Sequence, residues 1–445
     1  MRHDTITAVL AAATDWRTLP GLFDEQMPET PYAESVSALL AYLSDPQMTL
    51  PPILLGPYDQ PIYEGFAALR ELVDWKNFRI KADTCRLKLV SGSSDEVLLK
   101  TSPDSWTNIY LLNYVLLASI IPDRQSAVVV TMRDDGLRIL EWIAHYQALG
   151  FEKIFIYSND NRDGSDRLLE CLADAGVISF IRNDVTGQES PQRKAFEHSL
   201  WRLPELRQFK WVFYADSDEF LRLSDLHDHS IASLLNDVEA RYQSRLPSAI
   251  CYHWKWFVSQ GTIFQSEEPL ISRFQHSIPH VSVKSIVHLC DVLTMRKLHF
   301  PLCNPSGFFV DSMLAEIPQS LSVDQQQLWA YDTPQYLGGQ LNHYWTKSFQ
   351  EFVVKKTRGD SLQNDDYRRE FEQFFVWNAP ETESNKDTSP ELYLARILRN
   401  KEVLRQIEKV RIADDEVRAE QKTMLDGSGG EEGLRDLYLK HSISG

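Results

Sequence analysis

Predicted strands and helices alternate between residues 127 and 181, and this order constrains the fold more than any other feature of the sequence. The apolar runs Ala127–Met132, Lys153–Ser158 and Val177–Ile181 are rich in β-branched or aromatic residues and are typical of buried strands. Between them, Leu137–Leu149 and Asp166–Ala175 have the apolar spacing of helices, and each is followed by a glycine. This order predicts βαβ units, and therefore a parallel sheet with helices on its faces.

The pattern continues with a helix predicted over Pro191–Leu203 and a fourth strand over Trp211–Ala215. Ligands of open α/β sheets bind beyond the carboxyl ends of the strands. We therefore expect three polar, acidic loops to share one edge of the sheet: Arg133–Asp135, Ser158–Asp163 and Asp216–Glu219.

Asp216 and Asp218 are the most informative residues of this edge. Two neighbouring carboxylates repel each other unless a cation or a donor compensates them, and hard divalent ions such as Mg²⁺ or Mn²⁺ prefer oxygen ligands. The pair therefore indicates a metal site, although taken alone it also fits a solvated strand end. A strand candidate at Ile250–Val258 follows. Leu341–Trp345 leads into a further helix, for which Ser348 with Glu351 forms a capping box.

Charge and composition exclude several classes of function. The 445-residue chain has 46 Lys and Arg against 63 Asp and Glu, a net charge of −17, which argues against nucleic acid or anionic lipid as a partner of the whole chain. Locally the balance reverses, because residues 251–300 carry five basic against three acidic residues and residues 341–360 four against two. The pattern is compatible with a small diphosphate held between a metal and a local basic patch.

Several features bear on location. The five cysteines are an odd number without a C-x-x-C pair, and the longest apolar run, Tyr110–Ile121, is shorter than the roughly 20 residues of a membrane-spanning helix. The N-terminus lacks the pattern of a secretory signal. We expect a cytoplasmic protein without a transmembrane span, with peripheral contact at the inner face of the membrane left open.

The chain divides into three predicted regions. Residues 1–122 form an accessory region of helices and a β-hairpin, residues 123–360 form the α/β domain, and residues 361–445 form a charged, solvated helical extension. The oligomeric state stays open.

The ordered motifs resemble those of family 2-like glycosyltransferases, in particular a subgroup with R-N-E, D-N-x-S-x-D-G-T and D-x-D-E-F motifs. The segments that carry the resemblance are 128–135, 140–150, 156–165, 211–221, 254–257, 273–274, 284–287, 299–300 and 343–348. The resemblance implies a GT-A fold, an α/β/α sandwich with a mixed, mainly parallel central sheet that binds a nucleotide-diphospho-sugar.

The resemblance also implies roles for individual residues. Asp218 would coordinate Mn²⁺ or Mg²⁺, Asp216 would contact the ribose or the metal through water, and His343 would be the distal metal ligand. The residues implied to bind the donor are Arg133, Asp134, Asn159, Asp160, Asp163, Gln192, Asp216, Lys284, Lys347, Lys355 and Arg358.

The chain departs from the family pattern in two loops. Asp134-Asp135 replaces the usual Asn-Glu, and Ser158 replaces an Asp that commonly contacts the base. The base therefore stays open, with UDP as the default. An inverting enzyme also needs a carboxylate to accept the proton of the acceptor hydroxyl. Glu267 and Glu268 are the first candidates by their order along the chain, and Asp311 is the reserve.

The function predicted from these observations is a metal-dependent, hexosyltransferase-like enzyme acting on a glycan or lipid-linked acceptor in cell-surface polysaccharide synthesis. A non-catalytic nucleotide-sugar or carbohydrate-binding protein is the first alternative, because a fold does not guarantee activity. A metal-dependent phosphohydrolase is the second. The pairs His227/His229 and His276/His280 lack the third ligand that would make a zinc site convincing.

Overall fold

The structure is a computed structural model that describes residues 122–185, 190–295, 298–299, 301–303, 307–318, 333–358, 371–378, 384–427 and 430–442. The helices and the hairpin expected within residues 1–122 lie outside the described residues. Most described strands belong to one sheet, in the order β3-β2-β1-β4-β7-β6-β11-β5.

The first half of this sheet is parallel, as the alternating pattern predicts. Its strands are β1 (Arg124–Met132), β2 (Lys153–Ser158), β3 (Ser179–Arg182) and β4 (Phe209–Asp216). The connecting helices are α7 (Gly136–Leu149), α8 (Ser165–Asp174) and α9 (Pro191–Arg202). α7 ends at Gly150, whose φ of 89° is a left-handed conformation that glycine adopts without strain.

The second half is mixed. β7 (His276–His288) runs antiparallel to both β4 and β6 (Ala249–Phe257), and β11 (Gly339–His343) lies parallel to β6 and antiparallel to β5 (Glu219–Leu223). Smaller strands are β8 (Val292–Thr294), β9 (Leu302–Cys303), β10 (Phe309–Val310) and β12 (Asn385–Lys386).

The remaining helices and short 3₁₀ turns cover the sheet and its ends. They are η2 (Pro204–Gln208), η3 (Asp225–His227), α10 (Ile231–Arg241), α11 (Leu270–Arg273), η4 (Leu289–Asp291), α13 (Phe349–Arg358), α14 (Phe371–Trp377), α15 (Glu391–Arg405), α16 (Glu408–Gly427) and α17 (Gly430–Ser442). No helix of the described ranges is long and apolar enough to cross a membrane.

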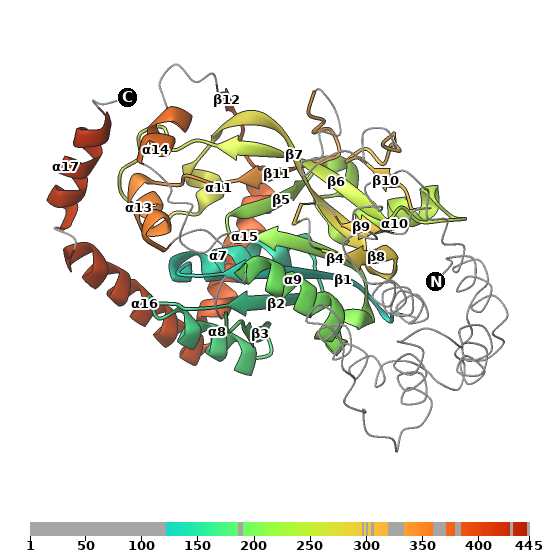
Figure 1. Ribbon diagram of the computed structural model, residues 1–445, viewed down its shortest axis with the longest axis horizontal. Coiled ribbons are helices and arrows are strands. Elements are labelled where there is room, and N and C mark those ends of the chain that lie inside the picture. Colours follow the sequence, from blue (N-terminus) through green and yellow to red (C-terminus); the bar gives the residue numbers. More distant parts are fainter. Residues whose placement is uncertain are drawn as a thin grey trace, which may run out of the picture.

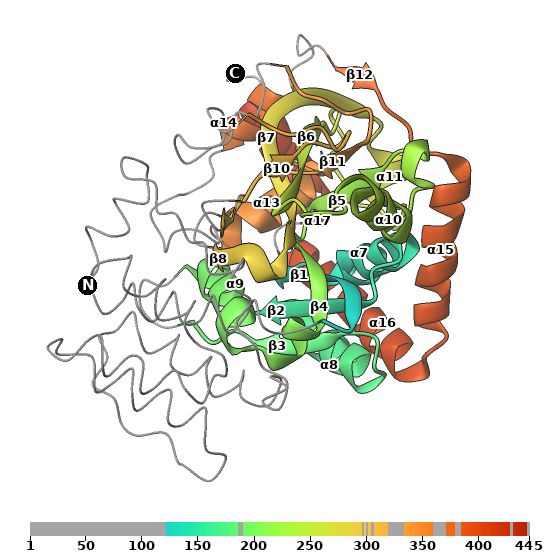
Figure 2. The ribbon, with the colours of Figure 1, turned by 90° about the vertical axis from the view of Figure 1, so that its right-hand side faces the viewer.

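The layers are visible in two views. β1, β2 and β4 lie in the middle of the parallel half, with α9 on one side and α7 and α8 on the other (Figure 1 and Figure 2). α15 and α16 lie outside α7 and α8 as a further cover (Figure 2). The expected fold class, a GT-A type α/β/α sandwich with a mixed, mainly parallel sheet, is confirmed.

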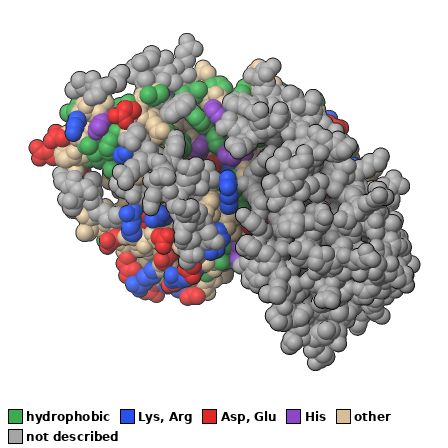
Figure 3. All heavy atoms as spheres, in the orientation of Figure 1, with side chains coloured by type: hydrophobic (Ala, Val, Ile, Leu, Met, Phe, Trp, Pro, Cys, Tyr) green, Lys and Arg blue, Asp and Glu red, His purple; other side chains and the backbone are tan. Residues whose placement is uncertain are grey.

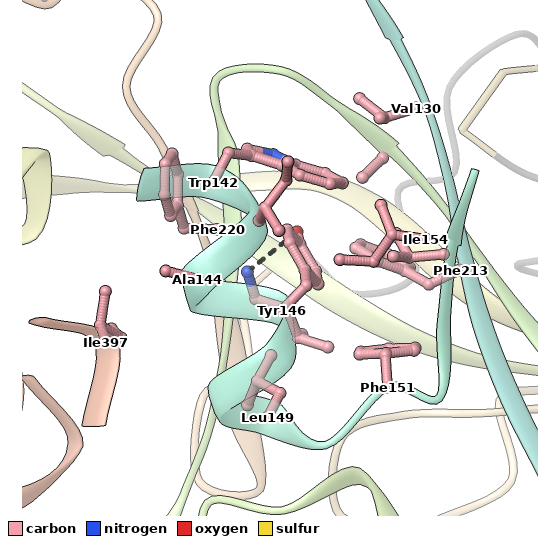
Figure 4. Close-up of a cluster of buried hydrophobic side chains, with 14 of the residues drawn as sticks. Val130, Trp142, Ala144, Tyr146, Leu149, Phe151, Ile154, Phe213, Phe220 and Ile397 are labelled. Carbon is pink, nitrogen blue, oxygen red and sulfur yellow. Dashed lines mark hydrogen bonds between the residues drawn. The ribbon is translucent and has the colours of Figure 1, made fainter. Parts of the chain in front are cut away.

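The core between α7 and the sheet is aromatic. Trp142 and Tyr146 of α7 are fully buried, with ring centroids 4.2 Å apart, and they pack toward Phe213 of β4 and Phe220 of β5 (Figure 4). Burial of side chains of this size is the main source of stability of such a layer.

The C-terminal helices correct one prediction. They are exposed on one side but not solvated all round, because Tyr393 and Ile397 of α15 and Val410, Ala413 and Val417 of α16 are buried in the same core cluster as α7. The reason is their spacing of three or four residues, which collects them on one face of each helix beneath the charged residues.

Candidate active site

The turn that carries Asp216 and Asp218 is held from below by helix α7. Nε1 of Trp142 donates hydrogen bonds to the backbone oxygens of Asp216 (3.3 Å) and Glu219 (3.2 Å). The hydroxyl of Tyr146 donates to the same Glu219 oxygen at 3.0 Å. These aromatic residues of the sequence motif therefore fix the end of β4 and the start of β5 in one position.

Asp218 lies in a buried, positively charged setting. Its Oδ1 is 3.5 Å from Nε2 of His343, and its Oδ2 accepts a hydrogen bond from Nζ of Lys355. Burial alone would raise the pKa of Asp218, but the charges of Lys355, His343 and Lys347 outweigh burial and hold it well below the ordinary value. The positive charges around Asp218 thus favour its ionised form.

Asp216 has a separate set of partners. Its Oδ1 accepts hydrogen bonds from Lys284, at 3.0 Å, and from Gln192 of α9. Glu219 lies behind it, with Oε2 3.7 Å from Nζ of Lys284 and 2.9 Å from the Asp216 backbone nitrogen. Burial, and then the charge of Asp216, raises the pKa of Glu219 well above its usual range. The two Asp residues are thus balanced by different lysines.

The first loop joins this group through Asp135. Oδ2 of Asp135 accepts a hydrogen bond from Oγ of Ser217 at 2.7 Å, and Oδ1 is 3.7 Å from Nζ of Lys347. Lys347 has a φ of 52°, a left-handed conformation that is costly for a residue with a side chain and often marks functional sites. The pocket at this point is lined by Asp134, Asp135, Leu137, Arg138, Gln265, Lys347, Glu351, Val354, Lys355 and Gln421.

The second loop is tied to the first. The carboxylate of Asp134 accepts from Nη2 (2.7 Å) and Nε (3.0 Å) of Arg162, and its backbone nitrogen donates to Oδ1 of Asn161 at 2.8 Å. Asn159 donates to Oδ2 of Asp160 at 3.0 Å, and Asp160 has a φ of 48°. Side chains of Arg162 and Asn161, which the sequence reasoning did not single out, thus organise the loops.

Asp163 holds three elements together. Its carboxylate accepts hydrogen bonds from the backbone nitrogens of Gly136 (2.8 Å) and Ser165 (3.1 Å), at the starts of α7 and α8, and from the Gln421 side chain of α16 (3.3 Å). It is fully buried. These contacts give it a structural task, and its predicted contact with the donor stays a prediction.

Helix α13 positions the lysine that contacts Asp218. The predicted capping box is present, because the Ser348 hydroxyl accepts from the Glu351 backbone nitrogen at 3.3 Å and Glu351 accepts from the Ser348 backbone nitrogen at 3.2 Å. Glu351 also forms a buried ion pair with Arg138 of α7, at 2.7 Å, and a second with Arg273. The start of α13 is therefore locked onto α7 and α11, one helical turn before Lys355.

The remaining predicted residues are Glu267, Glu268, Asp311, Arg133 and Arg358. Glu267 and Glu268 are exposed, and Glu267 forms an ion pair of 2.6 Å with Arg418 of α16. Asp311 accepts hydrogen bonds from backbone nitrogens of the following turn. The backbone nitrogen of Arg133 lies 3.4 Å from Asp135 Oδ2. The side chain of Arg358 is not described. The catalytic base stays a prediction.

An aromatic wall of Trp254, Trp256, His280 and His343 flanks the site, and the sequence reasoning gave its tryptophans no role. The rings of Trp256 and His280 stack at 4.1 Å with a 12° tilt, and Trp254 lies 4.5 Å from His343. The tryptophans are two residues apart on β6, a spacing that places both on one face and could have revealed the wall. Figure 3 shows histidine side chains gathered beside basic ones near the centre of the view.

The sequence model described as glycosyltransferase family 92 matches residues 130–375. The chain belongs to this family. The match confirms the expected kinship with glycosyltransferases, whereas the family 2-like subgroup and its motifs stay a prediction.

A glycosyltransferase family 92 protein of Ricinus communis is 30% identical to this family 92 chain over 99 residues, which are 22% of the chain and 17% of the Ricinus protein. The chain thus matches less than a fifth of that relative. Two solved structures of S. aureus TarS 1-349, one in complex with UDP, are similar to this chain. Each match covers 68% of this chain and 92% of the TarS chain. Their identities are 10% and 11%, both with a TM-score of 0.27. Scores this low carry no functional information.

Proposed function

We propose that this family 92 protein is a glycosyltransferase that moves a sugar from a nucleotide-diphosphate donor, with UDP-sugar as the default, to a hydroxyl of a glycan or lipid-linked acceptor. The observation that carries the proposal is the buried group of Asp218, His343 and Lys355 at the carboxyl end of β4. In an α/β sheet this is the edge where ligands bind.

The residues around Asp218 fit a divalent cation such as Mn²⁺ or Mg²⁺. Oδ1 of Asp218 and Nε2 of His343 face each other across 3.5 Å, and carboxylate oxygen with imidazole nitrogen is a donor set that Mn²⁺ accepts. Within the described part of the chain, Nδ1 of His343 has no hydrogen-bond partner. We assign the cation to Asp218 and His343, with Asp216 as a contact to the ribose or to metal-bound water. When bound, such a cation supplies charge neutralisation to the leaving diphosphate.

Lys347 and Lys355 are placed to bind the diphosphate of the donor. Lys347 and Lys355 line one pocket, where they contact Asp135 and Asp218. A diphosphate in this pocket competes with the two carboxylates for the ammonium groups. Donor binding therefore draws Lys355 toward phosphate and releases an oxygen of Asp218, which couples occupation of the pocket to the chemistry at the β4 end.

The aromatic wall gives the acceptor a surface. Faces of tryptophan rings pack against the apolar faces of sugars, and Trp256, which is partly exposed, lies near His343 of the neighbouring strand. We place the acceptor sugar there, on the side of His343 away from the lysines. Trp256→Ala is expected to raise the KM for acceptor with little change in the KM for donor.

The central experiment measures sugar transfer and donor hydrolysis with a panel of UDP-, GDP- and dTDP-sugars, with Mn²⁺ or with a chelator. Asp218→Asn keeps the shape of the side chain but removes its charge, and we expect it to lower kcat by about 100-fold or more. Asp225→Asn is the matched control, because Asp225 is 93% exposed and contacts only His229 among the described ion pairs.

Each competing reading has its own outcome. Equal activity with chelator and with Mn²⁺ would contradict metal dependence. Donor binding by calorimetry without turnover of any sugar nucleotide would favour the non-catalytic binding protein. Phosphate release from phosphate esters, without sugar transfer, would favour the phosphohydrolase.

The finer proposal is an inverting reaction in cell-surface polysaccharide synthesis, on the cytoplasmic side of the membrane. NMR of the first product formed gives the anomeric configuration directly. If the reaction inverts, Glu267→Gln and Glu268→Gln test the two base candidates, and an unchanged kcat in both would remove them.

A further inference from the structure

A cluster of side chains with metal-ligand chemistry lies at the far end of β7, away from the end of β4 that carries Asp218. His288 is the last residue of β7, and Cys290 and Asp291 follow in η4 before β8 begins. β4 and β7 are antiparallel, and His288 is opposite Trp211 near the start of β4. The cluster therefore lies at the opposite edge of the sheet from the candidate active site.

The donor atoms of the three side chains are close together. Nδ1 of His288 is 3.2 Å from Oδ2 of Asp291, and Sγ of Cys290 is 3.3 Å from Nε2 and 3.4 Å from Nδ1 of His288. One nitrogen, one sulfur and one oxygen thus lie within 4.8 Å of one another. Zinc ligands with bonds of about 2.0–2.3 Å in a tetrahedral arrangement are separated by distances of this order.

Neighbouring residues hold the cluster in place. The Ser248 hydroxyl donates to Oδ2 of Asp291 at 2.9 Å, and the backbone nitrogen of His288 donates to the backbone oxygen of Ser248 at 2.9 Å. The ring of Trp211 lies 5.0 Å from the ring of His288. Hydrogen bonds from such surrounding residues orient the ligands of metal sites and strengthen binding.

We propose that His288, Cys290 and Asp291 bind a structural zinc ion that ties the end of β7 to the β8–β9 pair. A thiolate and a carboxylate together balance the two positive charges of zinc, and a neutral imidazole completes three positions. A water molecule fills the fourth position, because Cys303 of β9, which faces Val292 of β8 in the register, is not among the donor atoms that lie within 4.8 Å of one another.

This donor set was absent from the sequence-based candidates because the ligands follow an H-x-C-D order rather than a spacing typical of zinc sites. Three histidines of the two pairs considered from the sequence have other partners. His227 contacts Asp237 at 2.7 Å, His229 contacts Asp225 at 2.6 Å, and His280 stacks on Trp256.

The test measures zinc in the purified full chain by mass spectrometry of the metal, and then replaces zinc by Co²⁺, whose thiolate ligands give a near-ultraviolet charge-transfer band. We expect stoichiometric zinc and a thiolate band, both lost in Cys290→Ser and retained in Cys171→Ser, a cysteine of α8. Asp218→Asn should keep the band, which separates this site from the proposed catalytic metal. Cys303→Ser should also keep the band, because Cys303 is not among the three ligands.

Two results would overturn the proposal. One is a chain without bound zinc whose Co²⁺ spectrum is the same in Cys290→Ser. The other is a disulfide between Cys290 and Cys303 in protein purified without oxidant, because both thiols would then be unavailable to a metal. If Cys290→Ser does not fold, Asp291→Asn provides the second variant, and its expected effect is a weaker affinity for zinc with the thiolate band still present.

Discussion

At the scale of a single residue, Trp142 both packs in the core and supports the turn that carries Asp216 and Asp218. Its ring is fully buried against Tyr146, while its single N–H group is shared between the backbone oxygens of Asp216 and Glu219. Position 142 therefore needs an aromatic ring for the core and a donor for the turn. Phenylalanine would satisfy the first need and leave both backbone oxygens without this donor.

We expect Trp142→Phe to lower the free energy of unfolding by about 1–3 kcal/mol, since a buried acceptor loses its partner. Transferase activity should fall as well, because the Asp216–Glu219 turn loses its support. Urea unfolding and steady-state kinetics measure the two effects. Trp211→Phe is the control, because Nε1 of Trp211 has no hydrogen-bond partner within the described ranges. Equal losses in both variants would assign the effect to packing alone.

Sequence alone identified Asp216 and Asp218 because a strand ending in two carboxylates is visible locally. It could not assign their partners. Lys355 lies 137 positions from Asp218 along the chain, and Lys284 lies 68 positions from Asp216. Such pairs depend on how β7 and α13 pack against β4, and no local pattern encodes that packing. The same limit explains why Gln192 could be proposed for the donor site but not placed beside Asp216.

At the scale of an element, helix α13 carries Lys355 to Asp218 and is itself fixed to α7 and α11. Its first turn is held by the Ser348–Glu351 capping box, and Glu351 lies between the guanidinium groups of Arg138 and Arg273. Burial would raise the pKa of Glu351, but the charges of Arg138 and Arg273 lower it well below its usual value. The orientation of the helix that carries Lys355 thus depends on one buried carboxylate.

Glu351→Gln is expected to lower the free energy of unfolding by about 3–5 kcal/mol, because buried Arg273 loses its counter-charge and buried Arg138 keeps only the 3.4 Å contact with Glu141. Ser348→Ala removes only the cap and should cost about 1 kcal/mol. Chemical denaturation of both variants measures the difference. Similar losses for the two substitutions would contradict a dominant role of the ion pairs. Activity at a temperature where Glu351→Gln stays folded then reports on the position of Lys355.

The parallel half of the sheet was predictable at the scale of the whole molecule, and the mixed half was not. β1, α7, β2, α8, β3, α9 and β4 follow one another in the chain, so periodicity and chain order were sufficient. In the mixed half, β11 lies between β5 and β6 in the sheet. It begins 116 positions after the end of β5 (339 − 223) and 82 positions after the end of β6 (339 − 257). The packing of the C-terminal helices was unpredictable for the same reason. Their apolar faces cover α7, which ends more than 200 positions before α15 begins (391 − 149), and chain order does not indicate that contact.

Buried histidines make the stability of the whole molecule depend on pH. Burial lowers the pKa of His145 to about 3 and the pKa values of His280 and His299 to about 4, from an ordinary value of 6.5, with the charge of Lys284 as a further cause for His299. The unfolded chain binds protons at these positions below pH 6.5, whereas the folded chain does not until near pH 4. The folded state is therefore favoured above this range and loses stability as the pH falls through it.

The free energy of unfolding is expected to fall by up to about 1.4 kcal/mol per pH unit for each fully buried histidine, and by less for the half-buried His280. Urea unfolding at several pH values across this range measures it. In His145→Asn the slope should be smaller, because one neutral buried imidazole is gone while a side-chain donor to the Leu221 backbone oxygen is kept. A slope that is the same in His145→Asn and the unmodified chain would show that other groups, such as the buried carboxylates, control the acid limit of this fold.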